Sequence, residues 1–215
     1  VDLGRQLSDD LAQDLAFHCD PEVQGYLVEL GQELLAAARR LEMIPDVYEF
    51  DFYVVDDANT VNAFAVPGGQ IYFYTGLILE AESEAEIAGV MGHEIAHVTE
   101  RHGAQRLAAQ FGIEQLTALI FGENASGLES LLVNVATTGA LLQYSQANEI
   151  EADERGVLFT IEAGYDLSTH PNPTNRVEKI ERILARYRGE LPEFQGDAAR
   201  FADIRERILM TDCRR

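Results

Sequence analysis

Three of the five histidines in this 215-residue sequence fall within ten positions, and two of them stand four residues apart. The segment His93–His97 reads H-E-I-A-H. Residues i and i+4 lie on one face of a helix, so both imidazoles can reach one ion. Zinc accepts such nitrogen ligands and, in catalytic sites, keeps one position for water. Glu94 can flank the ion without binding it, which suits a general base acting on that water.

A third ligand has to come from another part of the chain. The extended metzincin pattern needs a glycine at position 100 and a histidine at position 103, where this chain has Glu100 and Gly103. His102 follows His97 by five residues, which is about 140° around a continuous helix. We therefore expect that His102 does not share the ion.

A second acidic cluster, E-I-E-A-D at 149–153, offers the missing carboxylate. Glu149 and Asp153 are four residues apart, so one of them can bind the metal while the other orients a ligand histidine. Glu151 is expected to point away from both. The spacing alone leaves open which of the two carboxylates is the ligand.

Most of the elements that carry these motifs are expected to be helices. Apolar residues recur at helical spacing from 21 to 41. Ser83 and Glu86 form a capping-box pattern and predict the start of a helix that runs through the histidines to about Gln110. The remaining expected helices are 8–18, 113–121, 127–144, 146–163, 176–188 and 198–210.

Three short strands are expected between the first two long helices. Alternating or β-branched and aromatic residues predict them at 47–55, 61–66 and 70–74. Their close spacing favours a small sheet that is antiparallel at least in part. We therefore predict a single α+β domain dominated by helix. Its expected limits are 1–215, with a core of about 20–188 and the helices 8–18 and 198–210 as appendages.

The composition restricts the classes of partner. The chain has 16 Lys+Arg against 37 Asp+Glu and a formal net charge of −21, so we expect no nucleic-acid partner, which would require a basic surface. No run of 18 apolar residues predicts a transmembrane segment, although peripheral membrane association stays compatible with the sequence. Cys19 and Cys213 lie near opposite ends and could form a disulfide or remain two thiols.

Several further segments follow one another in a characteristic order between about 20 and 188. They are V-N-A-F-A-V-P-G-G at 61–69, Y-T-G-L at 74–77, the histidine motif with its continuation to Gly103, the acidic cluster at 149–153, A-G-Y-D at 163–166 and T-H-P with a later arginine at 169–176. In these motifs the sequence resembles the M48 peptidases, a family of zinc metallopeptidases with membrane-bound and soluble periplasmic members. The resemblance implies a zincin-like α+β fold, with a small three-stranded sheet and an active-site helix that carries H-E-x-x-H.

The resemblance also implies roles for individual residues. His93, His97 and Glu149 would hold one Zn²⁺ per chain. Glu94 would be the catalytic base, and Asp153 would support a ligand histidine. These assignments select Glu149 as the third ligand, which the spacing alone did not.

Two later residues match the T-H-P-x-x-x-x-R element of the family. The resemblance implies that His170 approaches or gates the metal and that Arg176 stabilises the oxyanion. His170 could instead only cap a loop, and Arg176 could be one more surface cation. Family members usually carry a helix of a few dozen residues before this element, whereas here only Leu167 and Ser168 intervene after Asp166.

The segment before the third strand is implied to bind substrate. An extended peptide substrate is expected to pair with the strand that contains Asn62, Ala63, Phe64 and Ala65. The Phe64 ring and the aromatics at 72–74 are expected to belong to the sheet core rather than to a substrate pocket.

Together these observations predict a zinc-dependent endopeptidase that hydrolyses protein substrates bound in extended form, in cell-envelope quality control. The alternative is a chaperone-like binding protein in which His170 occupies the open metal position and latches an inactive site. The sequence starts at Val1, which is compatible with an exported protein whose leader has been removed and with a periplasmic or other envelope location in a bacterium. A cytoplasmic location is compatible with the same composition.

Overall fold

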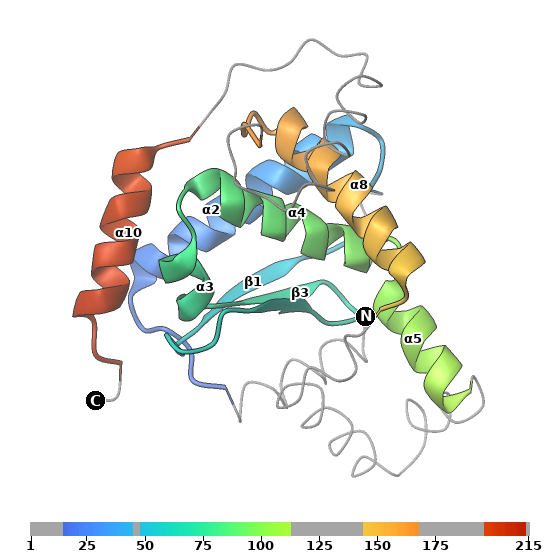
Figure 1. Ribbon diagram of the computed structural model, residues 1–215, viewed down its shortest axis with the longest axis horizontal. Coiled ribbons are helices and arrows are strands. Elements are labelled where there is room, and N and C mark those ends of the chain that lie inside the picture. The colour runs from blue at the N-terminus through green and yellow to red at the C-terminus, as the bar shows by residue number, and fades with distance from the viewer. Residues whose placement is uncertain (1–14, 45–47, 113–143, 168–195, 214–215) are drawn as a thin grey trace.

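The computed structural model of the chain describes residues 15–44, 48–112, 144–167 and 196–213. The described elements are α2 (Pro21–Arg40), β1 (Asp51–Val55), β2 (Ala63–Ala65), β3 (Gln70–Tyr74), α3 (Thr75–Glu80), α4 (Glu84–Thr99), α5 (His102–Phe111), α8 (Gln146–Glu162) and α10 (Ala198–Met210). Helices α2 and α4 cross the same face of a small sheet, and α8 packs against both of them (Figure 1). The α+β fold, mainly helical with a three-stranded sheet, is confirmed. Among the described helices, none combines the length and the apolar character needed to cross a membrane.

The sheet has the strand order β1-β3-β2 and is mixed. The central strand β3 is buried along its whole length; it pairs in parallel with β1 and antiparallel with β2, where Phe64 lies opposite Tyr72. The expected antiparallel pairing is therefore confirmed for one of the two ladders. Phe64 and Tyr72 are 3% and 0% exposed, so both side chains belong to the sheet core as predicted. Strand β2 is the edge that faces α4.

Helix α4 begins where the sequence predicted. The hydroxyl of Ser83 accepts a hydrogen bond from the backbone N–H of Glu86 at 3.3 Å, which satisfies one of the free donors at the helix start. Ile87, Met91 and Ile95 are fully buried and lock one face of the helix into the core. This packing fixes the rotation of α4 and with it the direction of the histidine motif.

The helix predicted to run from Ser83 to about Gln110 is two helices. α4 ends at Thr99, and Arg101 adopts a left-handed conformation with φ of 58° before α5 starts at His102. Few non-glycine residues adopt this conformation, and it interrupts the helix. Arg101 Nε donates a hydrogen bond to the hydroxyl oxygen of Tyr48 at 3.0 Å, which ties the break to the segment before β1. The prediction of one continuous helix was wrong. Neither proline nor glycine occupies positions 100 and 101, so the residue types at the break did not indicate it.

Helices α4 and α8 touch through two glycines. A Cβ atom on Gly92 would lie 2.7 Å from the carbonyl oxygen of Gly156, and one on Gly156 would lie 2.7 Å from the backbone nitrogen of His93. Thr160 adds a hydrogen bond from its hydroxyl to the carbonyl oxygen of Ala88 at 3.3 Å. The two backbones therefore meet next to the first residue of the histidine motif.

The two ends of the described chain are joined. A disulfide links Cys19, just before α2, to Cys213, just after α10, with a Cα–Cα distance of 5.5 Å. The C-terminal helix 198–210 has the predicted bounds and packs against α2 and α3. The helix predicted at 8–18 is wrong at its described end, because Phe17 forms a β-bridge with Val55. The segments 8–14, 113–121, most of 127–144 and 176–188 lie outside the described residues, and so does the predicted end of the core at 188.

Candidate metal centre and active site

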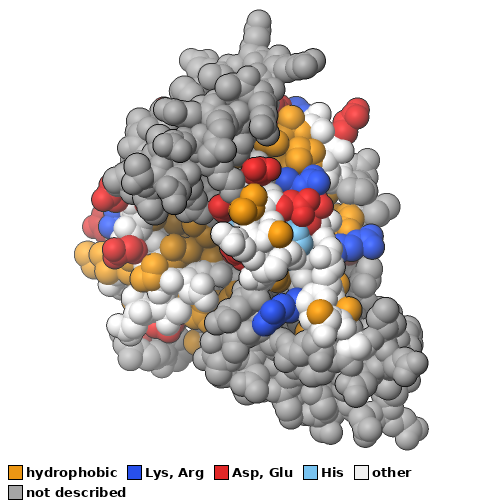
Figure 2. Space-filling model, turned by 45° about the vertical axis from the view of Figure 1, so that its right-hand side comes forward, with side chains coloured by type: hydrophobic (Ala, Val, Ile, Leu, Met, Phe, Trp, Pro, Cys, Tyr) orange, Lys and Arg blue, Asp and Glu red, His pale blue; other side chains and the backbone are white. Residues whose placement is uncertain are grey.

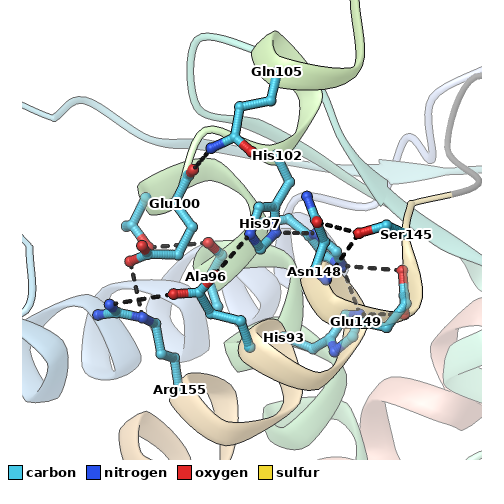
Figure 3. Close-up of polar contacts among 12 residues, drawn as sticks. His93, Ala96, His97, Glu100, His102, Gln105, Ser145, Asn148, Glu149 and Arg155 are labelled. Carbon is cyan, nitrogen blue, oxygen red and sulfur yellow. Dashed lines mark hydrogen bonds and ion pairs between the residues drawn. The ribbon is translucent and has the colours of Figure 1, made fainter. Parts of the chain in front are cut away.

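Three side chains converge between α4 and α8 (Figure 3). His93 and His97 come from consecutive turns of α4, and Glu149 comes from the first turn of α8. One ligand atom from each lies within 4.8 Å of the others. The two Nε2 atoms are 2.9 Å apart, and they lie 3.6 Å and 3.7 Å from the carboxylate oxygens of Glu149. Both rings thus turn the same nitrogen toward one point beside the carboxylate.

These distances fit a zinc ion. Tetrahedral zinc with bonds of about 2.0–2.1 Å separates its ligand atoms by about 3.3–3.4 Å, which falls between the separations found in the chain. Burial lowers the pKa of His97 to about 3, with the charges of His93 and His102 acting in the same direction. The neutral imidazole that results is the form that ligates metals. The site borders a cavity of about 300 Å³ that could admit water and substrate.

A second grouping of donor atoms does not make a comparable site. His18, Asp56 and Cys213 also bring one atom each within 4.8 Å of the others. The sulfur of Cys213 is held in the disulfide with Cys19, however, and cysteine binds metals as the thiolate.

Asp153 lies where a supporting carboxylate was predicted. Its Oδ1 is 3.0 Å from Nδ1 of His93, the ring nitrogen that faces away from the cluster. Burial by itself would lower the pKa of His93, but the hydrogen bond to Asp153 and the charges of Glu94 and Glu149 outweigh it and raise the pKa. A carboxylate on the far nitrogen of a ligand histidine fixes its orientation and its tautomer.

Glu94 lines the same cavity as the candidate ligands without belonging to their cluster. Burial raises the pKa of its carboxyl group to about 7, against the opposing charge of His93. A backbone hydrogen bond with Ala65 connects Glu94 to β2. The carboxylate is therefore held between the histidine motif and the edge strand, which is a suitable place for a general base.

The four predicted substrate-binding residues lie along β2 and just before it. Asn62 accepts a hydrogen bond from Tyr74, and Val66 donates one to Gln70, so these residues turn their backbone groups toward β3. Residues alternate along an antiparallel strand, so the backbone groups of the intervening alanines point to the outer edge. Asn62, Ala63 and Phe64 line the cavity next to the histidines, and Ala65 lines an adjoining pocket of about 480 Å³.

Two residues that contact His97 were not predicted from the sequence. Tyr144 stacks on the ring of His97 with centroids 4.0 Å apart and lines both pockets. His102 places Nδ1 at 2.9 Å from Nδ1 of His97, and its Nε2 lies 3.4 Å from Glu151. His102 is not part of the candidate ligand group, as predicted, but the assumption of a continuous helix also ruled out its contact with His97. On the face shown in Figure 2, histidine surface is visible only as a small patch close to acidic side chains.

The two remaining candidates, His170 and Arg176, lie outside the described residues. Their roles stay predictions, as does the latch that His170 would provide.

The donor set of two histidines and a glutamate, with a further glutamate beside it, is that of the metallopeptidase class of catalytic zinc sites. Comparison with known families supports the same class. The model of peptidase family M48 matches residues 21–184, and the chain belongs to this family. The resemblance noted from the sequence motifs is thereby confirmed.

Individual relatives match over most of the chain. A putative beta-barrel assembly-enhancing protease of Vibrio cholerae is 32% identical over 87% of this chain and 40% of its own length. The beta-barrel assembly-enhancing protease of Escherichia coli K12 is 29% identical over 87% of the chain and 39% of its length. A mitochondrial metalloendopeptidase OMA1 of Arabidopsis thaliana is 35% identical over 56% of the chain and 24% of its length. The chain thus spans about two fifths of the length of the bacterial relatives.

Proposed function

We propose that this chain is a zinc-dependent endopeptidase that hydrolyses peptide bonds of protein substrates. His93, His97 and Glu149 would hold one Zn²⁺, and Glu94 would act as the base. The observation that carries the proposal is the convergence of these four side chains on one cavity beside an edge strand. Membership of peptidase family M48 supports the same activity.

The chemistry divides between the ion and the side chains. A bound zinc ion supplies Lewis acidity, which polarises the scissile carbonyl and makes water more acidic. The carboxylate of Glu94 takes a proton from the attacking water and delivers it to the leaving amine. Asp153 holds His93 in the tautomer that offers Nε2 to the ion. Arg176 would stabilise the negative charge on the carbonyl oxygen.

The substrate would bind as an extended strand along β2. The outward backbone groups of Ala63 can pair with a peptide, and Asn62 stands at the end of the strand next to the catalytic cavity. Pairing through the main chain tolerates many sequences, whereas side chains of the peptide would enter the neighbouring pockets. An edge strand with a cavity at its side therefore supports cleavage within unfolded or extended segments of proteins.

The setting that we propose is protein quality control in the bacterial cell envelope, in the periplasm. The names of the two bacterial relatives, beta-barrel assembly-enhancing proteases, support this setting. The disulfide between Cys19 and Cys213 supports it independently, because disulfides persist in oxidising compartments such as the periplasm.

The proposal is tested by zinc analysis together with cleavage of a casein-type substrate. Glu94→Gln should keep the bound zinc and the fold but lose cleavage, because the amide cannot accept the proton. Glu154→Gln, an exposed glutamate on α8, is the matched control and should cleave like the wild type. Full activity of Glu94→Gln with zinc bound would refute the mechanism. His170→Ala addresses the alternative function, because a latched protein should become more active when the histidine is removed.

A further inference from the structure

Both ring nitrogens of the buried His97 have a polar neighbour. Its Nε2 faces His93 and Glu149, whereas its Nδ1 lies 2.9 Å from Nδ1 of His102 (Figure 3). His97 and His102 are 3% and 1% exposed, so water has little access to either ring. A buried nitrogen pair at this distance needs one hydrogen atom between the two rings.

The break between α4 and α5 makes this contact. On a continuous helix His102 would lie about 140° away from His97. The left-handed Arg101 turns the chain, and α5 then carries His102 back over the last turn of α4. The same turn is held by a hydrogen bond from the backbone N–H of Arg101 to the carbonyl oxygen of Val98 at 3.0 Å.

The hydrogen atoms can be assigned from one condition, which is that His97 offers the Nε2 lone pair to a metal. A neutral ring that binds through Nε2 carries its hydrogen on Nδ1, and this hydrogen is donated to Nδ1 of His102. His102 then carries its own hydrogen on Nε2, which points at Oε2 of Glu151 at 3.4 Å, the long end of the hydrogen-bond range. Each nitrogen of the two rings has a partner in this arrangement, and no ring has to change its charge.

Glu151 also contacts a basic side chain of its own helix. Its second oxygen lies 3.6 Å from Arg155, one turn later on α8. Arg155 also donates from Nε to Glu100 at 2.9 Å, at the end of α4. Glu151 and Asp153 are two residues apart on α8, so they approach the histidines from different sides. Asp153 reaches His93 directly, whereas Glu151 reaches His97 through His102.

We propose that His102 and Glu151 are positioning residues that fix the tautomer and the orientation of the metal ligand His97. The inference rests on the proposed metal site. Mutation of a residue that hydrogen-bonds to a metal-ligating histidine typically lowers the metal affinity about 10–100-fold. The pair would thus act on metal affinity without touching the ion or the substrate.

The experiment measures the zinc dissociation constant of the whole chain by competition with a chromophoric chelator. His102→Leu removes both nitrogens at similar volume and should raise the dissociation constant about 10–100-fold. His102→Asn keeps an acceptor where Nδ1 stands and should recover most of the affinity. The dissociation constant of Glu151→Ala should lie between those of the wild type and His102→Leu. Two controls match them: His18→Leu removes a buried histidine elsewhere, and Glu154→Ala removes an exposed glutamate of α8.

The outcomes separate this inference from the proposed function. If the wild type binds no zinc, or His93→Ala leaves its zinc affinity unchanged, the proposed metal site fails and the inference fails with it. If the wild type binds zinc but His102→Leu stays within about threefold of it, only the inference is overturned. If His18→Leu weakens zinc binding as much as His102→Leu does, the inference is also overturned, because replacing any buried histidine would then have the same effect. If His102→Leu does not fold, Glu151→Ala decides, since the Glu151 side chain is 48% exposed and its loss should leave the fold intact.

Discussion

The contact between α4 and α8 passes through glycine backbone, and an added methyl group tests whether this contact builds the site. A Cβ on Gly156 would lie 2.7 Å from the backbone nitrogen and 2.9 Å from the Cα of His93, whereas ordinary contacts begin at 3.4 Å. Gly156→Ala therefore forces the helices apart by about 0.7 Å (3.4 − 2.7) at this point. The opposing atoms are backbone and cannot rotate aside.

The cost of this overlap exceeds the intrinsic advantage of alanine. Overpacking costs about 1–3 kcal/mol, and alanine in a helix interior gains about 1 kcal/mol over glycine. We take the upper half of the first range and expect Gly156→Ala to lower the free energy of unfolding by about 1–2 kcal/mol. Gly25→Ala is the matched control. It lies within α2, a Cβ there meets nothing within 4 Å, and it should raise the free energy of unfolding by about 0.5–1 kcal/mol.

Urea unfolding of the metal-free variants measures the change in the free energy of unfolding. Zinc titration measures the change in zinc affinity. Because Glu149 comes from α8 and both histidines come from α4, a displaced α8 should weaken zinc binding in Gly156→Ala but not in Gly25→Ala. If Gly156→Ala is as stabilising as Gly25→Ala and binds zinc equally well, the close helix contact does not determine the geometry of the site.

Three further predictions concern the disulfide, a buried carboxyl group and the metal. Replacing Cys19 and Cys213 by serine should lower the free energy of unfolding by about 2–4 kcal/mol in urea, because the bridge closes a sequence separation of 194; an unchanged midpoint would contradict this. Burial raises the pKa of Glu84 above its usual 4.5, so the stability linked to this group is present below pH 4.5 and is lost as the pH rises through the folded-state pKa. Glu84→Gln should therefore increase the free energy of unfolding more at pH 7 than at pH 4, and equal urea curves for the variant and the wild type at both pH values would speak against it. A chelator should abolish cleavage of the casein-type substrate and added zinc should restore it, whereas activity of the metal-free chain would exclude the proposed role of zinc.

Features that depend on local periodicity were predicted well from the sequence. The strand 70–74 and the helix 198–210 have the predicted bounds, since residue type and spacing along these segments select one structure. The meeting of the two histidines follows from their i,i+4 spacing and needed no tertiary information. The family motifs supplied the third group, Glu149, which the spacing alone could not distinguish from Asp153.

Features that depend on contacts between distant segments were not predicted. The break after Thr99 is held by Tyr48, which lies about fifty residues earlier, and nothing in the local sequence signals it. β1 pairs in parallel with β3 because β2, which lies between them in the sequence, is placed on the other side of β3 in the sheet. The contact between His102 and His97 was not predicted, because the helix geometry was applied to a helix that does not continue. In each case a tertiary contact overrides the local pattern.

These observations place the candidate site within the contact between α4 and α8. In the proposed site, α4 would supply two nitrogen ligands, and α8 would supply one oxygen ligand together with the carboxylates of Asp153 and Glu151, which would orient the two histidines. An ion bound there would bridge the two helices, so its binding free energy would add to the stability of their contact. By linkage, zinc at 100 times its dissociation constant would stabilise the folded chain by about 2.7 kcal/mol. Changes that loosen the helix contact and changes that misalign a histidine should therefore lower this stabilisation by zinc, and only the former should also destabilise the metal-free chain.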